Sequence, residues 1–232
     1  RRAGEIERIR RGAYRVVPDD GSRGPDTWSA ARRLQVDRAR ALSRQLRSAH
    51  WFSHQTAAML HGLPLWRLPA ETHVLQTYRA SSRAATDVRR HFVEERLPDG
   101  CEVLGLPVST LERTVADCAT TLPPLDALVV TDAALARGLD RDRTAELVSM
   151  RSRGARRALL VLDLADPGAE SPWESWLRYV CYWAGLPRPR TQVPVRTAIG
   201  RFRVDLGWED HGGIAEFDGL VKYRSGALGK DH

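Results

Sequence analysis

Apolar and polar residues alternate along two stretches of this chain, one near each end. The first stretch, GEIERIRRGAYRVV at residues 4–17, alternates as far as Arg11 and Gly12 and resumes at Ala13. Alternation with a period of two is typical of β-strands, and a glycine between two such runs is typical of a tight turn. The sequence therefore predicts a β-hairpin here, before the break at Pro18.

Between the two alternating stretches, the apolar spacing mainly predicts helices. A long one at residues 27–50 carries Arg32, Arg33, Arg38, Arg40, Arg44 and Arg47, which either follow a phosphate backbone or form a solvated face. Shorter helices are expected at 54–61 after Ser53, at 111–120 after a capping box of Ser109 and Glu112, at 125–137 and at 141–150. ETHVLQTY, residues 71–78, is expected to be a strand.

The segment DLADPGAESP, residues 163–172, is the best candidate for a linker, because it combines two prolines and a glycine. After it, SPWESWLRYVCYWAG predicts a helix from Ser171 to Gly185, with a capping box formed by Ser171 and Glu174. We therefore expect three parts: a front end at 1–50, a mostly helical middle region at 51–165 and a C-terminal unit at 166–232.

Positive charge is concentrated at the front of the chain. The formal net charge is +7, and the first fifty residues hold 13 arginines against 6 acidic residues. A basic front end indicates a polyanion partner such as nucleic acid, although the preference for arginine over lysine is also typical of a GC-rich genome. Three cysteines without CxxC spacing, no apolar run that could span a bilayer and no visible secretion signal predict a cytoplasmic protein.

The second alternating stretch, RFRVDLGWEDHGGIAEFDG at residues 201–219, gathers acidic residues on one face. If Gly212 and Gly213 form the turn, Trp208 pairs with Gly213, and Asp205 comes to lie opposite Glu216. Asp218 shares that face, while Val204, Leu206, Ala215 and Phe217 form an apolar face. Three carboxylates suit Mg²⁺ or Mn²⁺, and the alternative is a solvated hairpin face without an ion.

This hairpin, with the helix before it, resembles the PD-(D/E)XK nuclease superfamily, and more narrowly the domain similar to very-short-patch repair endonucleases. The resemblance implies an α/β restriction-endonuclease-like domain in which Asp205, Glu216 and Asp218 hold the metal. Asp218 stands where the family has a lysine, so Lys222 would supply the positive charge, and Glu174 would assist unless it only caps its helix, with Glu170 as the substitute. Since the family's core continues with another helix and strand, we expect this domain to be truncated at its C-terminus.

The front and middle segments RRAGEIERIRRGAYRVV, FSHQTAAMLHGLP and LPVSTLERTVADCA resemble the AbiEi-family antitoxins of type IV toxin–antitoxin systems, in their actinobacterial branch. The resemblance implies a winged-helix remnant whose recognition helix precedes residue 1. The wing arginines Arg8, Arg10, Arg11 and Arg15 would then contact DNA phosphates or the minor groove. Its functional implication is a non-catalytic antitoxin or autorepressor that binds promoter DNA and has a degenerate nuclease fold. A third interpretation makes the middle region a module that binds a cognate toxin.

Taken together, the sequence predicts an α+β protein that binds DNA and hydrolyses phosphodiester bonds with Mg²⁺ or Mn²⁺. The alternative is the non-catalytic antitoxin. Asp117 and Asp132 are expected to be buried acids paired with an arginine such as Arg113. Packing or capping is expected for His50, His54 and His61, rather than zinc binding, because no cysteine or acidic partner is near them in the sequence.

Overall fold

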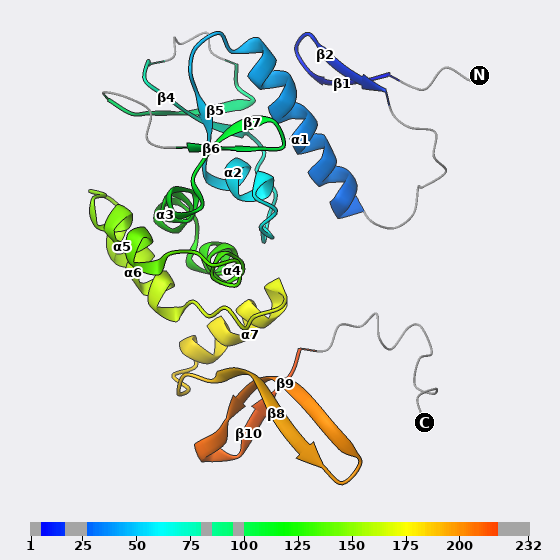
Figure 1. The fold of residues 1–232 in the computed structure, drawn as a ribbon, viewed down its shortest axis with the longest axis vertical. Coiled ribbons are helices and arrows are strands. Elements are labelled where there is room, and N and C mark those ends of the chain that lie inside the picture. The colour runs from blue at the N-terminus through cyan, green and yellow to red at the C-terminus, as the bar shows by residue number, and fades with distance from the viewer. Residues whose placement is uncertain (1–5, 17–26, 80–84, 95–99, 218–232) are drawn as a thin grey trace, which may run out of the picture.

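The computed structural model describes residues 6–16, 27–79, 85–94 and 100–217. Within these ranges the chain forms seven α-helices, one short 3-10 helix and ten strands in three sheets, which is a mixed α+β fold. Figure 1 shows the front hairpin and the last three strands at opposite ends of the molecule. No helix in the described ranges has the length and apolar character required to cross a membrane.

The front of the chain is a two-stranded antiparallel hairpin followed by a long helix. Strand β1 (Ile6–Arg10) pairs with β2 (Ala13–Val16) around a turn at Gly12, whose φ is +72°, a value that glycine adopts without strain. Helix α1 (Thr27–Gln45) lies beside the hairpin and buries Ala39 and Leu42. The predicted hairpin is confirmed, and so is the long helix, which ends at Gln45 and not at His50.

The next part of the chain forms a mixed five-stranded sheet in the order β5-β4-β3-β7-β6. Its members are β3 (Trp51–Phe52), β4 (Thr72–Gln76), β5 (Val88–Phe92), β6 (Gly100–Val103) and β7 (Leu106–Ser109). The β4–β5 and β3–β7 pairs are parallel, whereas β3–β4 and β6–β7 are antiparallel. Of these strands, the sequence predicted β4 alone.

Five helices build the main core with this sheet: α2 packs against the strands, and the other four pack on α2 and on one another. They are α2 (His54–Leu60), α3 (Leu111–Thr121), α4 (Pro124–Leu135), α5 (Arg141–Ser149) and α6 (Ala155–Leu164). Their apolar faces share one buried cluster with Phe52, Val74 and Val108 of the sheet. Four of the five helices match the predicted positions to within two residues at each end, and α6 was not predicted.

One predicted cap is wrong by one residue. Helix α3 begins after Thr110, whose hydroxyl accepts the N–H of Arg113 at 3.3 Å. The Ser109 side chain, which was expected to cap this helix, instead makes a 2.8 Å hydrogen bond with the Thr114 hydroxyl. Two adjacent hydroxyl residues can each serve as a cap, so the sequence pattern did not distinguish them.

The C-terminal unit is a helix followed by an antiparallel three-stranded sheet in the order β10-β9-β8. Helix α7 (Pro172–Trp183) leads to β8 (Arg190–Thr197), β9 (Gly200–Trp208), a 3-10 turn (Glu209–His211) and β10 (Gly213–Ala215). Strand β9 is central and turns its buried residues Val204 and Leu206 inward. The predicted helix and the predicted hairpin are confirmed.

Buried acids join the helices, as the sequence predicted. Asp117 on α3 is paired with Arg113, with 3.0 Å between its Oδ1 and Nε of the arginine, and also with Arg151. Asp132 on α4 is paired with Arg178 on α7, and both of these side chains are almost fully buried. The second pair spans the linker near residue 165, so α7 packs directly against the middle part of the chain.

Candidate functional site

The register of the last hairpin agrees with the prediction as far as the strands pair. Trp208 lies opposite Gly213, Gly207 opposite Ile214 and Leu206 opposite Ala215. The same count would set Asp205 opposite Glu216, but β10 ends at Ala215. The hairpin therefore brings these two acidic residues to neighbouring positions without pairing them in the ladder.

Asp205 lies on the central strand β9 and is half-buried. Its Oδ2 accepts the backbone N–H of Phe217 at 2.8 Å, which fixes the chain just beyond β10. Glu216 is exposed beside it. The other two candidates from this stretch, Asp218 and Lys222, lie outside the described residues.

Glu174 lies in the first turn of α7 and is 9% exposed. The Ser171 hydroxyl accepts the N–H of Glu174 at 3.2 Å, which confirms Ser171 as the cap. The Glu174 carboxylate in turn accepts the N–H of Glu170 at 2.9 Å and the side-chain amide of Gln192 on β8 at 3.2 Å. Glu174 therefore stabilises the start of the helix and also connects it to the sheet.

An aromatic contact joins α7 to the end of the hairpin. The rings of Trp173 and Phe217 stack with their centroids 5.0 Å apart and their planes 3° from parallel. Trp176 meets the same phenylalanine ring edge-on at 6.4 Å. Aromatic pairs in these arrangements are attractive beyond their burial. The contact brings the helix residue Glu174 and the hairpin residue Asp205 to the same part of the C-terminal unit.

These carboxylates do not form a compact set of metal ligands. Among the described residues, the group of three or more possible ligands that lie within 4.8 Å of one another consists of His54, His73 and His91, not of Glu174, Asp205 and Glu216. As hard oxygen donors the three acids fit Mg²⁺ or Mn²⁺ in kind. Holding one ion would require their side chains to converge further.

The four arginines of the front hairpin differ in what they contact. Arg8 and Arg11 are exposed. The side chain of Arg10 is only 7% exposed and lies 3.6 Å from the Asp87 carboxylate, and burial lowers the pKa of its guanidinium. Arg15 forms ion pairs with Glu7 at 2.6 Å and Asp37 at 3.4 Å. Two of the four candidates are thus engaged within the protein, and two face solvent.

A groove of about 400 Å³ runs between this hairpin and α1. Its lining includes Tyr14 from β2 and Arg40 and Arg44 from the helix. Both of these arginines are exposed, as is the tyrosine ring. Exposed guanidinium groups beside an aromatic ring are suited to contact with nucleic acid, so this groove extends the basic surface of the hairpin.

Sequence reasoning missed two of the three clustered histidines. His73 lies on β4 and His91 on β5, and the parallel pairing of these strands brings them near His54 at the start of α2. The expectation that His54 only packs or caps did not include these partners. A pairing between strands that are separated by a long connection leaves no local signal in the sequence.

Comparison with known proteins does not assign a family. No protein-family model matches the chain. Two uncharacterized proteins from strains of Mycobacterium tuberculosis, MT2308 and Rv2248, are each 36% identical to it over 113 residues, or 46% of this chain and 41% of theirs. The chain thus spans less than half the length of these relatives. The crystal structure of the RV2827C protein from Mycobacterium tuberculosis matches 70% of this chain and 65% of that chain at 18% identity, with a TM-score of 0.42.

Proposed function

We propose that this protein binds DNA and that its C-terminal unit is a metal-dependent endonuclease that acts in the bacterial cytoplasm. The observation that carries the proposal is the order of elements around Asp205. A capped helix bearing Glu174 precedes three antiparallel strands, with Asp205 on the central strand and Glu216 directly after the next one. This is the order that the endonuclease resemblance implies.

Asp205 and Glu216, together with Asp218, would hold Mg²⁺ or Mn²⁺. Such an ion, when bound, activates water and stabilises negative charge on a phosphodiester. Glu174 is already fixed by Gln192 and by the N–H of Glu170, so it would orient the site from the helix side. Lys222 would neutralise charge on the phosphate in place of the lysine that Asp218 replaces.

DNA binding is assigned to the exposed part of the front end. Arg40 and Arg44 are exposed at the groove between the hairpin and α1, and Arg8 and Arg11 are exposed on β1 and in the turn that follows it. Contacts from such arginines to phosphate give affinity and orientation without reading sequence. Arg10 and Arg15 would support the hairpin through their ion pairs instead of touching DNA.

A second candidate is a non-catalytic antitoxin and autorepressor that binds a cognate toxin. The observation in its favour is that Asp205 and Glu174 each accept hydrogen bonds from N–H groups of the protein itself. Carboxylates held in this way can be structural, and the acidic residue at the family's lysine position agrees with a degenerate site. On this view the front end binds promoter DNA, and the nuclease-like unit does not cut.

The deciding experiment is cleavage of supercoiled plasmid by the full chain with Mg²⁺ or Mn²⁺. The variants are Asp205→Asn and Glu216→Gln, and Asp210→Asn in the exposed turn of the same hairpin is the matched control. Metal-dependent nicking that both variants lose and the control keeps is the expected result. Retarded DNA migration without nicking would favour the repressor, and neither binding nor nicking would refute both candidates.

A further inference from the structure

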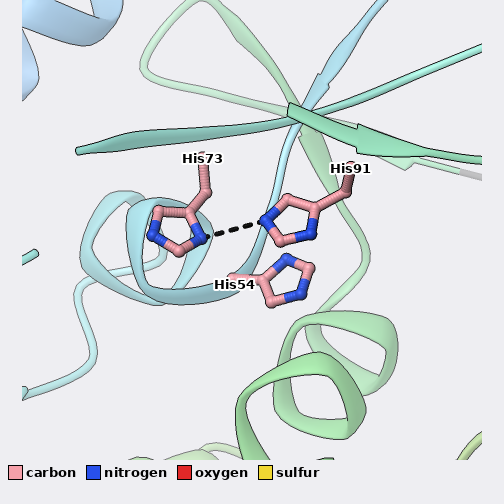
Figure 2. A group of neighbouring side chains, drawn as sticks. All are labelled: His54, His73 and His91. Carbon is pink, nitrogen blue, oxygen red and sulfur yellow. Dashed lines mark hydrogen bonds between the residues drawn. The ribbon is translucent and has the colours of Figure 1, made fainter. Parts of the chain in front are cut away.

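Three histidine side chains from different elements meet at one place in the middle of the chain. Figure 2 shows His54 from α2, His73 from β4 and His91 from β5 with their rings side by side. Each offers a ring nitrogen, and these nitrogens all lie within 4.8 Å of one another. We propose that this cluster binds one transition-metal ion of the zinc, nickel or cobalt type.

The spacing of the ring nitrogens suits such an ion. Nδ1 of His73 and Nε2 of His91 are 3.1 Å apart. Two imidazole nitrogens at the usual Zn–N distance of about 2.0–2.1 Å stand roughly 3.3 Å apart in tetrahedral geometry. In the ion-free protein this short separation is an N–H···N hydrogen bond, in which one neutral ring donates to the other. A bound ion would lie between these two nitrogens, and the donor ring would then carry its proton on its other nitrogen.

The rings remain neutral over the pH range in which a metal ion would bind. Burial, more than any other influence, lowers the pKa of His73 to about 4 and that of His91 to about 3, and it lowers the pKa of His54 well below its ordinary value. A protonated imidazole has no lone pair for a metal ion. The same burial opposes any cation, so binding would depend on the short distances between the three ring nitrogens.

The backbone at His54 is held in an uncommon conformation. Its φ is +52°, in the left-handed region that few residues other than glycine adopt. This conformation accompanies a stack in which the rings of His54 and His91 lie 3.6 Å apart with 14° between their planes. Strain of this kind collects at sites where a side chain must be aimed. The strained backbone at His54 is thus what we expect of a residue whose ring is aimed at an ion.

An open pocket of about 430 Å³ borders both His54 and His91. It gives an ion a route to the cluster, and it gives the stacked rings room to turn so that their lone pairs converge. Asp117, also in the lining, has its carboxylate 3.9 Å from Nδ1 of His54. That distance is too long for a hydrogen bond, and the partner of Nδ1 is the Ser53 hydroxyl, 3.0 Å away. A hydrogen bond on Nδ1 fixes the ring and leaves its other nitrogen, Nε2, available to an ion. Ser53 is therefore the positioning residue of this site.

The charges around the pocket predict which ions are accepted. Arg90, Arg113 and Arg151 line it, and Asp117 is paired with the last two of them. The surplus of positive charge opposes any cation, so binding depends on strong bonds to imidazole. Zinc, nickel and cobalt form such bonds, whereas Mg²⁺ prefers oxygen ligands. This selectivity separates the histidine site from the carboxylate site proposed for the C-terminal unit.

The test uses the full chain after treatment with a chelator. It is titrated with Zn²⁺ in a calorimeter and, in a separate experiment, with Co²⁺ while the visible spectrum is recorded. Wild type should bind one ion per chain, and Mg²⁺ should not compete. His73→Asn and His91→Asn should each weaken binding at least about tenfold, since even outer-shell changes cost that much. His211→Asn, at an exposed position in the last hairpin, is the matched control and should bind as wild type does.

A readout on the unaltered chain covers the case in which a variant fails to fold. Zn²⁺ should shift the imidazole ¹⁵N resonances of His54, His73 and His91, and of no other histidine. The proposal is overturned if wild type binds no Zn²⁺, if the two variants bind it as tightly as wild type, or if other histidines shift instead. DNA cleavage is not part of this test, so its outcome is independent of the endonuclease proposal.

Discussion

The buried pair of Asp132 and Arg178 offers the sharpest test of how the C-terminal helix is held. The side chains are 1% and 4% exposed. The carboxylate also accepts the hydroxyl of Ser175 at 2.7 Å and the backbone N–H of Asp166 at 2.9 Å. One aspartate on α4 thus serves three donors from the linker and from α7. The perturbation is Asp132→Ala.

The expected loss follows from what the substitution leaves behind. Without the carboxylate, the Arg178 guanidinium keeps its contact with the carbonyl of Leu164 but loses its counter-charge inside the protein. Breaking a buried pair in this way costs about 3–5 kcal/mol. If Arg178→Met is made first, Asp132→Ala leaves the Ser175 hydroxyl and the Asp166 N–H without their acceptor, which costs roughly 1–3 kcal/mol. It also removes a carboxylate that Arg178→Met has left without a counter-charge, so the net cost should be smaller than this. The difference between the two backgrounds isolates the ion pair.

Urea unfolding followed by tryptophan fluorescence and by circular dichroism measures both costs. Because the pair crosses the linker, both signals of the wild-type protein should change in one transition. A cost below about 1 kcal/mol for Asp132→Ala, or an equal cost in both backgrounds, would refute the argument, since it would mean that the guanidinium finds water without the carboxylate. Asp142→Ala, at an exposed position in α5, is the matched control and should change stability by less than about 0.5 kcal/mol.

Three further outcomes are expected. His73 and His91, with pKa values of about 4 and about 3, stay neutral in the folded protein below pH 6.5 while the unfolded chain takes up protons. The free energy of unfolding should therefore fall as the pH drops from 6.5 towards 4, by up to about 1.4 kcal/mol per pH unit for each ring. Urea midpoints that stay constant between pH 7.5 and 5 would contradict this. Gly154→Ala should lower the free energy of unfolding in urea by at least about 2 kcal/mol, because φ is +78° and the added Cβ would lie 2.3 Å from the carbonyl oxygen of Thr120 on α3. Gly138→Ala is the control: φ is +85° but the space around it is open, so it should cost less. Arg11→Ala should reduce the slope of log affinity for DNA against log salt by about one, and an unchanged slope would exclude a phosphate contact.

Local signals account for the elements that the sequence predicted correctly. Ser171 and Pro172 define the start of α7 because both act within one helical turn. Gly212, with φ +61°, sets the register of the last hairpin because the turn and the strands that it joins are adjacent in the chain. The position of Asp205 beside the end of β10 therefore follows from the amino-acid sequence alone.

Pairings between distant segments account for most of what was missed. Strand β3 has only two residues, Trp51 and Phe52, and it is a strand because β4 and β7 flank it. Helix α6 follows a basic segment, and its apolar residues Val161 and Leu162 become a helical face only when they pack into the shared core. Neither element has a capping or turn signal strong enough to be recognised on its own.

For the same reason, functional residues were harder to predict from the sequence than helices and strands. A basic hairpin is a pattern in the sequence and predicted DNA contacts for Arg10 and Arg15, but the sequence did not show that these two arginines form ion pairs with Asp87 and Asp37 from other parts of the chain. Conversely, no pattern in the neighbouring residues marks any of the three clustered histidines as a metal ligand. His73 and His91 acquire a shared site only through the parallel register that sets Leu75 opposite His91 and His73 opposite Arg89. A functional site that depends on such a register can be recognised only when the positions of the strands in space are known. A site on a single hairpin can be predicted from residues that are close together in the chain.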